Sequence, residues 1–401
     1  MKHTKLPILL MLFSFNTPAF AEPSSFSDAF SQGEAHVNFR YRFENVDQDG
    51  ISNDASASTL KTQVNYMSKA YSGYSFFIEV DDLSYLADDN FNNTRNGKAN
   101  YPVVADPDGT AINQLFVRYN VDNTRFTLGR QRINRDNERF IGGVGWRQNE
   151  QTYDAFSVKN TSIEGLTINY DYLNKVHRIF GPDDGAAAKS FDSNSHLLNA
   201  NLKIGDKGTL VAYAYDLDFD DASAFSNQTT GLRYSNKLVK EGYSFPFKVE
   251  YARQTDNGDN TNSYSSQYYL LEGGVNVDKH LVKLTYEVLG GSNTPGERFQ
   301  TPLATLHGFQ GWADKFLNTP TNGIEDLYLT LGTSWNKTKL TVVYHDFSAE
   351  EGSTDYGSEL DVALNHKVND NYSVLLKWAK FNADDLATDT NKLWLMLTAK
   401  F

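Results

Sequence analysis

The sequence of 401 residues contains no cysteine and only 10 prolines. Disulfides are therefore excluded, and so is zinc–thiolate, iron–sulfur or cysteine-nucleophile chemistry. Helical periodicity is almost absent, and no low-complexity tract divides the chain into domains. Basic residues are fewer than acidic ones, 37 against 50, and the net charge of -13 argues against nucleic acid as a partner.

The first 21 residues have the pattern of a secretory signal peptide. Lys2 and Lys5 form a positive start, residues 6–15 form a short apolar core, and residues 19–21 read Ala-Phe-Ala. The apolar run is too short to anchor the chain in a membrane. We therefore expect residues 1–21 to be removed on export, leaving a single domain at 22–401.

Alternation of apolar and polar residues with a period of two dominates the rest of the chain. In "HVNFRYRFE" and "NKLWLMLTAKF", for example, every second side chain is apolar. Many such segments reach the roughly 9–11 residues that a tilted strand needs to cross a bilayer. We predict eighteen strands at about 34–46, 57–68, 73–86, 111–121, 123–133, 150–160, 163–178, 192–205, 208–218, 226–237, 243–255, 264–277, 279–290, 322–335, 337–348, 356–368, 370–382 and 389–401.

The connections between these segments alternate between long and tight along the whole chain. Outer-membrane barrels show this pattern, with short periplasmic turns and long external loops. An apolar sheet face is stable in lipid only when no strand edge is left unpaired. The sequence thus predicts an all-β, transmembrane antiparallel barrel of about 18 strands around a polar lumen. The terminal Phe401 resembles the end of barrels handled by the outer-membrane assembly machinery.

The same alternation predicts which side chains face the lumen. Acidic lumen residues include Glu44, Asp171 and Glu287. Basic lumen residues are densest in the first five strands, which predicts one cationic wall, although lumen charges often only pair across strands. These basic residues are Arg40, Arg42, Lys61, Arg118 and Arg125.

One connection, "TLGRQRINRDNERFIGGVGWRQNEQTYDAF", gathers arginines in this acidic chain. Its G-R-Q, W-R-Q and Tyr153-Asp154, together with the segment "TPLATLHGFQGWADKFLNTPTNGIEDLYL", resemble the alginate-export-type outer-membrane channels, which are related to substrate-specific porins. The resemblance implies an eighteen-stranded monomeric barrel with inward-folding loops and an arginine-rich conduit for an anionic solute. The arginines of this connection are Arg130, Arg132, Arg135, Arg139 and Arg147.

The chemistry of arginine also favours an anionic solute. Guanidinium groups stay charged at any working pH, bind carboxylates bidentately and favour anions at a constriction. Trp146 and Trp312 are candidate platforms for sugar rings, or else they pack an inward-folded loop against the wall. Glycines at 142, 143 and 145 are expected to let the connection turn sharply.

The sequence therefore predicts a porin in the outer membrane of a Gram-negative bacterium, a passive channel for small anionic saccharides or carboxylates. The expected surroundings are outer-membrane lipid and lipopolysaccharide, with no cofactor or metal. Two alternatives stay open: a barrel enzyme with a site at His345 or His307, and a structural or adhesive barrel with a plugged lumen. No H-E-x-x-H, G-x-S-x-G or phosphate-loop motif occurs in the sequence.

Overall fold

The computed structural model describes residues 23–401, so the expected signal peptide at 1–21 lies outside the described residues. A short helix, α1 (Phe26–Ser31), precedes the first strand, and the Ser25 hydroxyl caps it by accepting from the Asp28 amide. Among the described helices, none has the length and apolarity to cross a membrane.

Eighteen strands make up almost all of the remaining regular structure. Three short 3₁₀ turns accompany them: η1 (Gly205–Lys207), η2 (Ser223–Phe225) and η3 (Leu306–Gly308). Every strand boundary lies within three residues of its predicted place. The strands are β1 (Glu34–Gln48), β2 (Ala55–Met67), β3 (Tyr74–Tyr85), β4 (Gly109–Val121), β5 (Thr124–Gln131), β6 (Thr152–Asn160), β7 (Leu166–His177), β8 (Ser190–Lys203), β9 (Thr209–Leu217), β10 (Asn227–Lys240), β11 (Tyr243–Asp256), β12 (Ser265–Val277), β13 (His280–Leu289), β14 (Ile324–Trp335), β15 (Thr338–Ser348), β16 (Asp355–Lys367), β17 (Tyr372–Ala383) and β18 (Thr390–Lys400).

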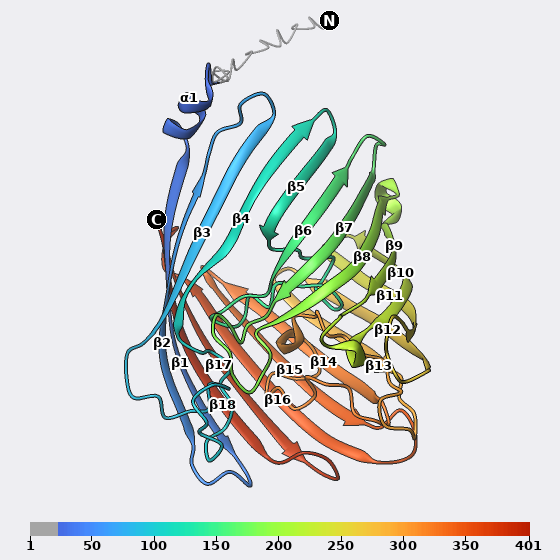
Figure 1. Cartoon of the computed structure of the whole chain (residues 1–401). Coiled ribbons are helices and arrows are strands. Elements are labelled where there is room, and N and C mark those ends of the chain that lie inside the picture. Colours follow the sequence, from blue (N-terminus) through green and yellow to red (C-terminus); the bar gives the residue numbers. More distant parts are fainter. Residues whose placement is uncertain (1–22) are drawn as a thin grey trace, which may run out of the picture.

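Each strand pairs antiparallel with its neighbours in the chain, and β1 also pairs with β18. The closing register places Phe39 opposite Ala399 and Glu44 opposite Trp394. This pairing joins the two ends of the sheet, which leaves no free edge and forms a closed barrel (Figure 1). The predicted all-β barrel of eighteen strands is confirmed.

The connections separate by length onto the two ends of the barrel. At the end that carries α1 the turns are tight, and Asp122, Asp278 and Asn336 begin three of them with φ of 47°, 51° and 49°. Asp and Asn tolerate this left-handed conformation better than other residues with a side chain. The long connections lie at the opposite end, and we name them loops L1 (49–54), L2 (86–108), L3 (132–151), L4 (178–189), L5 (218–226), L6 (257–264), L7 (290–323), L8 (349–354) and L9 (384–389).

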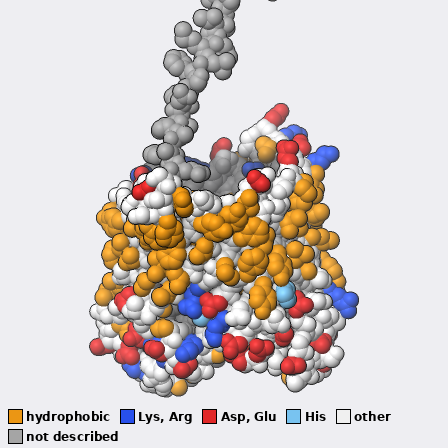
Figure 2. All heavy atoms as spheres, turned by 45° about the horizontal axis from the view of Figure 1, so that its top comes forward, with side chains coloured by type: hydrophobic (Ala, Val, Ile, Leu, Met, Phe, Trp, Pro, Cys, Tyr) orange, Lys and Arg blue, Asp and Glu red, His pale blue; other side chains and the backbone are white. Residues whose placement is uncertain are grey.

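The outer face of the barrel carries an apolar belt, which Figure 2 shows on the half nearer α1. Strand alternation produces this belt: Leu128, Leu271 and Leu284 are 64%, 61% and 53% exposed, while their sequence neighbours face inward. Charged side chains gather below the belt, toward the long loops (Figure 2). An apolar band of this kind is the surface that a transmembrane barrel presents to lipid.

The interior is less polar than the sequence predicts. Tyr213, Tyr215 and Tyr268 point inward from β9 and β12, where Phe140 of L3 and Phe299 of L7 pack against them. These aromatic side chains are removed from water only because two loops fold into the barrel. The expectation of a uniformly polar lumen is therefore wrong at the level of L3 and L7.

Candidate functional site

Loop L3 enters the barrel because the strands on either side of it are short. β5 ends after eight residues at Gln131, and β6 begins only at Thr152. The chain therefore leaves the wall partway along the barrel and crosses the interior (Figure 1). L3 is thus built to narrow the lumen from within.

Gly142 and Gly143 of L3 serve close packing rather than sharp turning, whereas a Cβ atom added to Gly145 would meet nothing within 4 Å. A Cβ atom added to Gly142 would lie 2.3 Å from Thr305 Oγ1, and one added to Gly143 would lie 2.9 Å from Arg132 Cγ. The left-handed φ in this segment belongs to Val144, at 49°, and not to glycine 142, 143 or 145. The expected turning role of the three glycines is therefore wrong.

L3 and L7 pack against each other across the lumen. Ile141 and Leu303 form an isolated parallel bridge, and the Gly142 amide donates to the Leu303 carbonyl at 2.8 Å. The Thr305 amide donates to the Glu138 carbonyl at 3.0 Å, and the Thr305 hydroxyl accepts from the Val144 amide at 3.1 Å. These hydrogen bonds satisfy backbone groups that would otherwise be buried without partners.

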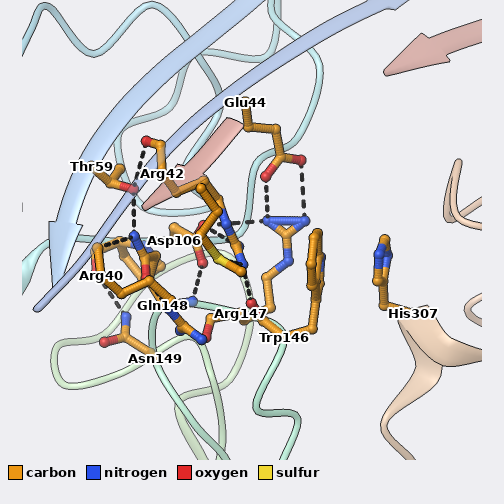
Figure 3. Close-up of polar contacts among 12 residues, drawn as sticks. Arg40, Arg42, Glu44, Thr59, Asp106, Trp146, Arg147, Gln148, Asn149 and His307 are labelled. Carbon is orange, nitrogen blue, oxygen red and sulfur yellow. Dashed lines mark hydrogen bonds and ion pairs between the residues drawn. The ribbon is translucent and has the colours of Figure 1, made fainter. Parts of the chain in front are cut away.

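Two arginines of L3 are buried and paired with carboxylates of the inner wall. Arg139 Nε donates to Glu287 Oε1 at 2.8 Å, and both side chains are 1% exposed. Arg147 binds Glu44 bidentately at 3.1 and 3.2 Å and also contacts Asp106 at 3.4 Å (Figure 3). Burial alone would lower the pKa of Arg147, but the nearby carboxylates of Glu44 and Asp106 raise it above its usual value.

Arg132 and Arg135 form further pairs. Arg132 Nε donates to Glu150 Oε2 at 2.8 Å, and Arg135 Nε donates to Asp171 Oδ2 at 3.1 Å. Burial would raise the pKa of Glu150, yet the positive charges of Lys61 and Arg132 outweigh it and lower that pKa to about 2. All four inward-pointing arginines of L3 therefore tether the loop to acids of the wall or the loop itself, which reduces the free positive charge expected in the lumen.

Arg130 lies on the outer face of the barrel. It shares the outward orientation of Leu128, two residues earlier on β5, which is 64% exposed. Its guanidinium Nε donates to Asp154 Oδ1 at 2.8 Å, across the strand pair on the same face. The prediction that Arg130 lines the pore is therefore corrected.

Basic residues midway along the first two strands also bind L3. Arg40 donates from Nε to Gln148 Oε1 and from Nη1 to the Gly145 carbonyl, both at 2.8 Å, and Arg42 donates to the Trp146 carbonyl (Figure 3). The Lys61 ammonium lies 2.7 Å from Asp81 Oδ2 of β3 and 3.4 Å from Glu150 Oε1 of L3. These three cations point inward, but they hold the loop in place.

Arg118 and Arg125 differ from those side chains. They lie toward the tight-turn end of the lumen, where Arg118 stacks over Phe116 at 5.1 Å and Arg125 donates to Asn120 Oδ1 at 2.9 Å. Within residues 23–401, neither of the two has a carboxylate in ion-pair contact. Their charges are therefore available to a solute on that side of L3.

The two tryptophans expected to stack sugars are covered. Trp146 lies between the His307 ring, stacked at 4.2 Å, and the Arg42 guanidinium at 4.3 Å (Figure 3). The Lys377 ammonium sits 3.8 Å from the centre of the Trp312 ring. Both indoles therefore pack the inward-folded loops onto the wall, which was the alternative interpretation.

A cavity of about 390 Å³ lies on the external side of L3, lined by L1, L2, L3, L4 and L7. Its apolar lining includes Tyr101, Phe180 and Leu317. Two of its cations have no carboxylate in ion-pair contact within the described chain. Arg178 is held between Phe180 at 4.6 Å and Phe191 at 4.3 Å, and Lys315 donates to the Thr390 hydroxyl at 2.9 Å.

Burial lowers the pKa of both residues, that of Arg178 to about 10 and that of Lys315 to about 8. Sequence reasoning missed both, because they are isolated residues in L4 and L7 rather than members of an arginine cluster. In the sequence alone, Phe180 and Phe191 do not indicate that they will flank Arg178, because the folded loops bring them together.

At the floor of this cavity, His307 of L7 is held within its own loop and to β17 of the wall by polar contacts. Its Nδ1 lies 2.7 Å from Asp314 Oδ1, and its Nε2 lies 2.6 Å from the Lys377 ammonium. Burial lowers the pKa of His307 well below its usual value, and the charges of Lys377 and Arg147 lower it further. A neutral ring with its proton on Nδ1 donates to Asp314 and accepts from Lys377, so all three groups are satisfied.

The histidines of the enzyme alternative are both tied to acids. Nδ1 of His345 lies 2.9 Å from Asp326 Oδ1, and its other nitrogen lies 3.7 Å from Asp361 Oδ2. Asp346, its sequence neighbour, is on the opposite face of β15, as predicted. Neither His345 nor His307 is hydrogen-bonded to a serine or threonine hydroxyl in the described part of the chain, so no nucleophile–base pair is assembled there.

A closed barrel of eighteen strands with two loops folded inward is the architecture of outer-membrane porins. The family model described as "Alginate export" matches residues 32–167 of this chain. This match confirms the resemblance to alginate-export-type porins for the arginine-rich connection and its G-R-Q and W-R-Q motifs, whereas the second segment, at 301–329, lies outside it. No curated protein matches the chain.

Solved structures share the fold over nearly the whole chain. OccAB4 of Acinetobacter baumannii superimposes with a TM-score of 0.73 at 14% identity, covering 92% of this chain and 98% of that one. OccK1 (OpdK) of Pseudomonas aeruginosa gives 0.70 at 12% identity, with 93% and 99% covered. OccAB2 of Acinetobacter baumannii gives 0.72 at 15% identity, also with 93% and 99% covered.

Proposed function

We propose that this protein is a passive outer-membrane channel for small anionic solutes, carboxylates or acidic saccharides. The observation that carries the proposal is the placement of Arg178 and Lys315 in the 390 Å³ cavity without carboxylate partners in the described chain. A cation with no acid in ion-pair contact is free to exchange its hydrogen-bond partners for the oxygens of an anionic solute.

The path continues on the other side of L3. Arg118 and Arg125 face the lumen there, again without an acid in contact within residues 23–401. Between the two pairs of cations, L3 and L7 form the constriction. The arginines of L3 set the shape of this constriction, because their charges are matched by Glu44, Glu287 and the other paired acids.

The apolar wall of the cavity supports a solute with a hydrophobic or aromatic part. Arg178 stacks on Phe180, and Tyr101 lines the same space. A guanidinium held between aromatic rings is desolvated and fixed, so it loses little entropy when it binds a carboxylate. The structure of OpdK, which shares the fold, was solved with vanillate, an aromatic carboxylate. This likeness supports the solute class proposed here.

Planar-bilayer recording in a KCl gradient tests the proposal. The wild-type reversal potential should indicate preference for chloride, and Arg178→Gln with Lys315→Gln should move it toward the value of an unselective pore. Lys69→Gln removes an exposed charge beside α1 and should leave the potential unchanged. A preference of the wild type for cations contradicts the anionic solute, and a complete lack of conductance favours the plugged barrel.

A further inference from the structure

A notch interrupts the barrel wall where β5 ends. β4 continues to Gly109, but its pairing with β5 stops at Leu115 and Arg130. On the β6 side of the notch, the pairing of β6 with β7 ends at Thr152 and His177. A cavity of about 310 Å³ occupies the space that a longer β5 would fill. The notch lies on the side of the long loops, directly beyond the apolar belt.

The notch connects the outer face with the interior. Ile112, Lys175 and His177 line it from the outward-facing side, and Asp81 and Glu150 line it from the lumen. Two cations hold these two acids: Lys61 lies 2.7 Å from Asp81 and 3.4 Å from Glu150, and Arg132 Nε donates to Glu150 at 2.8 Å. The inner side of the notch is therefore neutralised by the protein itself.

The outer side is rich in cations, in a chain whose net charge is -13. Lys175 pairs with Asp192, which is 56% exposed, and Lys189 pairs with Asp184, which is 88% exposed. Exposed pairs of this kind contribute only about 0–1 kcal/mol, so they are readily exchanged for another anion. The outward-facing cations that line the notch are Arg130, Lys175 and Lys189, whereas Arg178, which also borders it, is held against Phe180 and Phe191 and belongs to the external cavity described above.

Apolar side chains border the notch on the side of the belt. Leu128 is 64% exposed, Ile112 is 44% exposed and Leu115 is 38% exposed. Leu128 precedes Arg130 by two residues on the same face of β5, so the apolar surface passes directly into the cationic one. A ligand that fits both surfaces has acyl chains and a polyanionic head.

We propose that this notch binds the phosphorylated headgroup of an outer-leaflet glycolipid, with its acyl chains against Leu128, Ile112 and Leu115. Phosphate oxygens accept hydrogen bonds from Lys175 and Lys189 in place of the exposed carboxylates, while Arg130 stays paired with Asp154 at the border of the apolar surface. The proposal rests on the outer-membrane placement given above, but it concerns the outer face and not the permeation path.

Native mass spectrometry of the detergent-solubilised barrel tests this assignment. Bisphosphorylated lipid A should bind, and the double variant Lys175→Gln, Lys189→Gln should bind it about thirtyfold more weakly, since each surface cation adds affinity for anionic lipid. The matched control, Lys237→Gln with Lys240→Gln, removes two exposed charges from β10 at the tight-turn end and should bind as the wild type does.

Three outcomes overturn the proposal. Dephosphorylated lipid A binds equally well, the Lys175 and Lys189 variant keeps its affinity, or millimolar inorganic phosphate displaces all of the bound lipid A. Channel conductance separates this inference from the proposed function. The Lys175 and Lys189 variant should conduct as the wild type does, so a loss of lipid binding with normal conductance concerns the notch alone.

Discussion

The rings of Trp146 and His307 stack with their centroids 4.2 Å apart and their planes within 5° of parallel. One ring belongs to L3 and the other to L7, so this contact joins the two loops that fill the lumen (Figure 3). Asp314 and Lys377 fix the imidazole on its two nitrogens, which makes the stack rigid. The constriction is therefore a single packed unit, assembled from segments far apart in the chain.

Replacement of His307 by alanine should loosen this unit without unfolding the barrel. The change removes the stacked ring and leaves the buried Lys377 ammonium without its partner, at a cost of about 2 kcal/mol to loop docking. Hydrogen exchange of the L3 amides, such as Gly142, should then accelerate by about thirtyfold. His366→Ala, at the exposed tight-turn end, is the control. Unchanged exchange in L3 would show that the stack does not hold the loop.

Arg139→Met should be the most damaging single change in L3. It leaves Glu287, which is 1% exposed, as a buried charge without its partner, a loss of about 3–5 kcal/mol. Urea-induced unfolding in phospholipid vesicles measures this loss. The double variant Arg139→Met, Glu287→Gln should recover much of it, because no charge is then left buried. If the double variant is no more stable than Arg139→Met, the unpaired charge of Glu287 is not the cause of the lost stability.

Alternation predicted the strands well because a membrane barrel wall has only two environments. Phe39 on β1 and Leu397 on β18 are 37% and 44% exposed, on the face expected for them. The rule is less informative on β9, where Leu210 and Ala212 face outward but Val211 and Tyr213 are buried inside. Both faces of such a strand are apolar, so parity alone does not predict that a loop covers the inner one.

The site was harder to predict than the wall, for a physical reason. The partner of Arg139 is Glu287, 148 residues away, and nothing in the local sequence of either residue indicates the other. Arg130 shows a second limit, since its direction depends on β5 continuing as a regular strand to Gln131. A cluster of arginines indicates that acids or anions are near, but it does not distinguish between them.

Acid should loosen the end of L3 that Glu150 holds. Burial would raise the pKa of Glu150, but Lys61 and Arg132 lower it from 4.5 to about 2. The pKa in the folded state is thus below that in the unfolded state, so its contribution, on the order of 3 kcal/mol, is complete above pH 4.5 and disappears as the pH falls toward 2. The protection factors of the L3 amides, that is, the exchange rate of an unfolded chain at the same pH divided by theirs, should fall over this range. Glu150→Gln should already exchange faster at pH 7, and its exchange should lack this part of the pH dependence.

Alkali should weaken the anion preference through Lys315. Burial, together with the charge of Lys392, lowers the pKa of Lys315 to about 8, so about a tenth of these side chains remain charged at pH 9. The reversal potential in a KCl gradient should therefore move toward zero between pH 7 and pH 9. Lys315→Arg keeps its charge at both pH values and should abolish most of this movement. An equal pH dependence in wild type and Lys315→Arg would place the titrating group elsewhere, whereas its loss in the variant identifies Lys315 as a charge that the permeating ion meets.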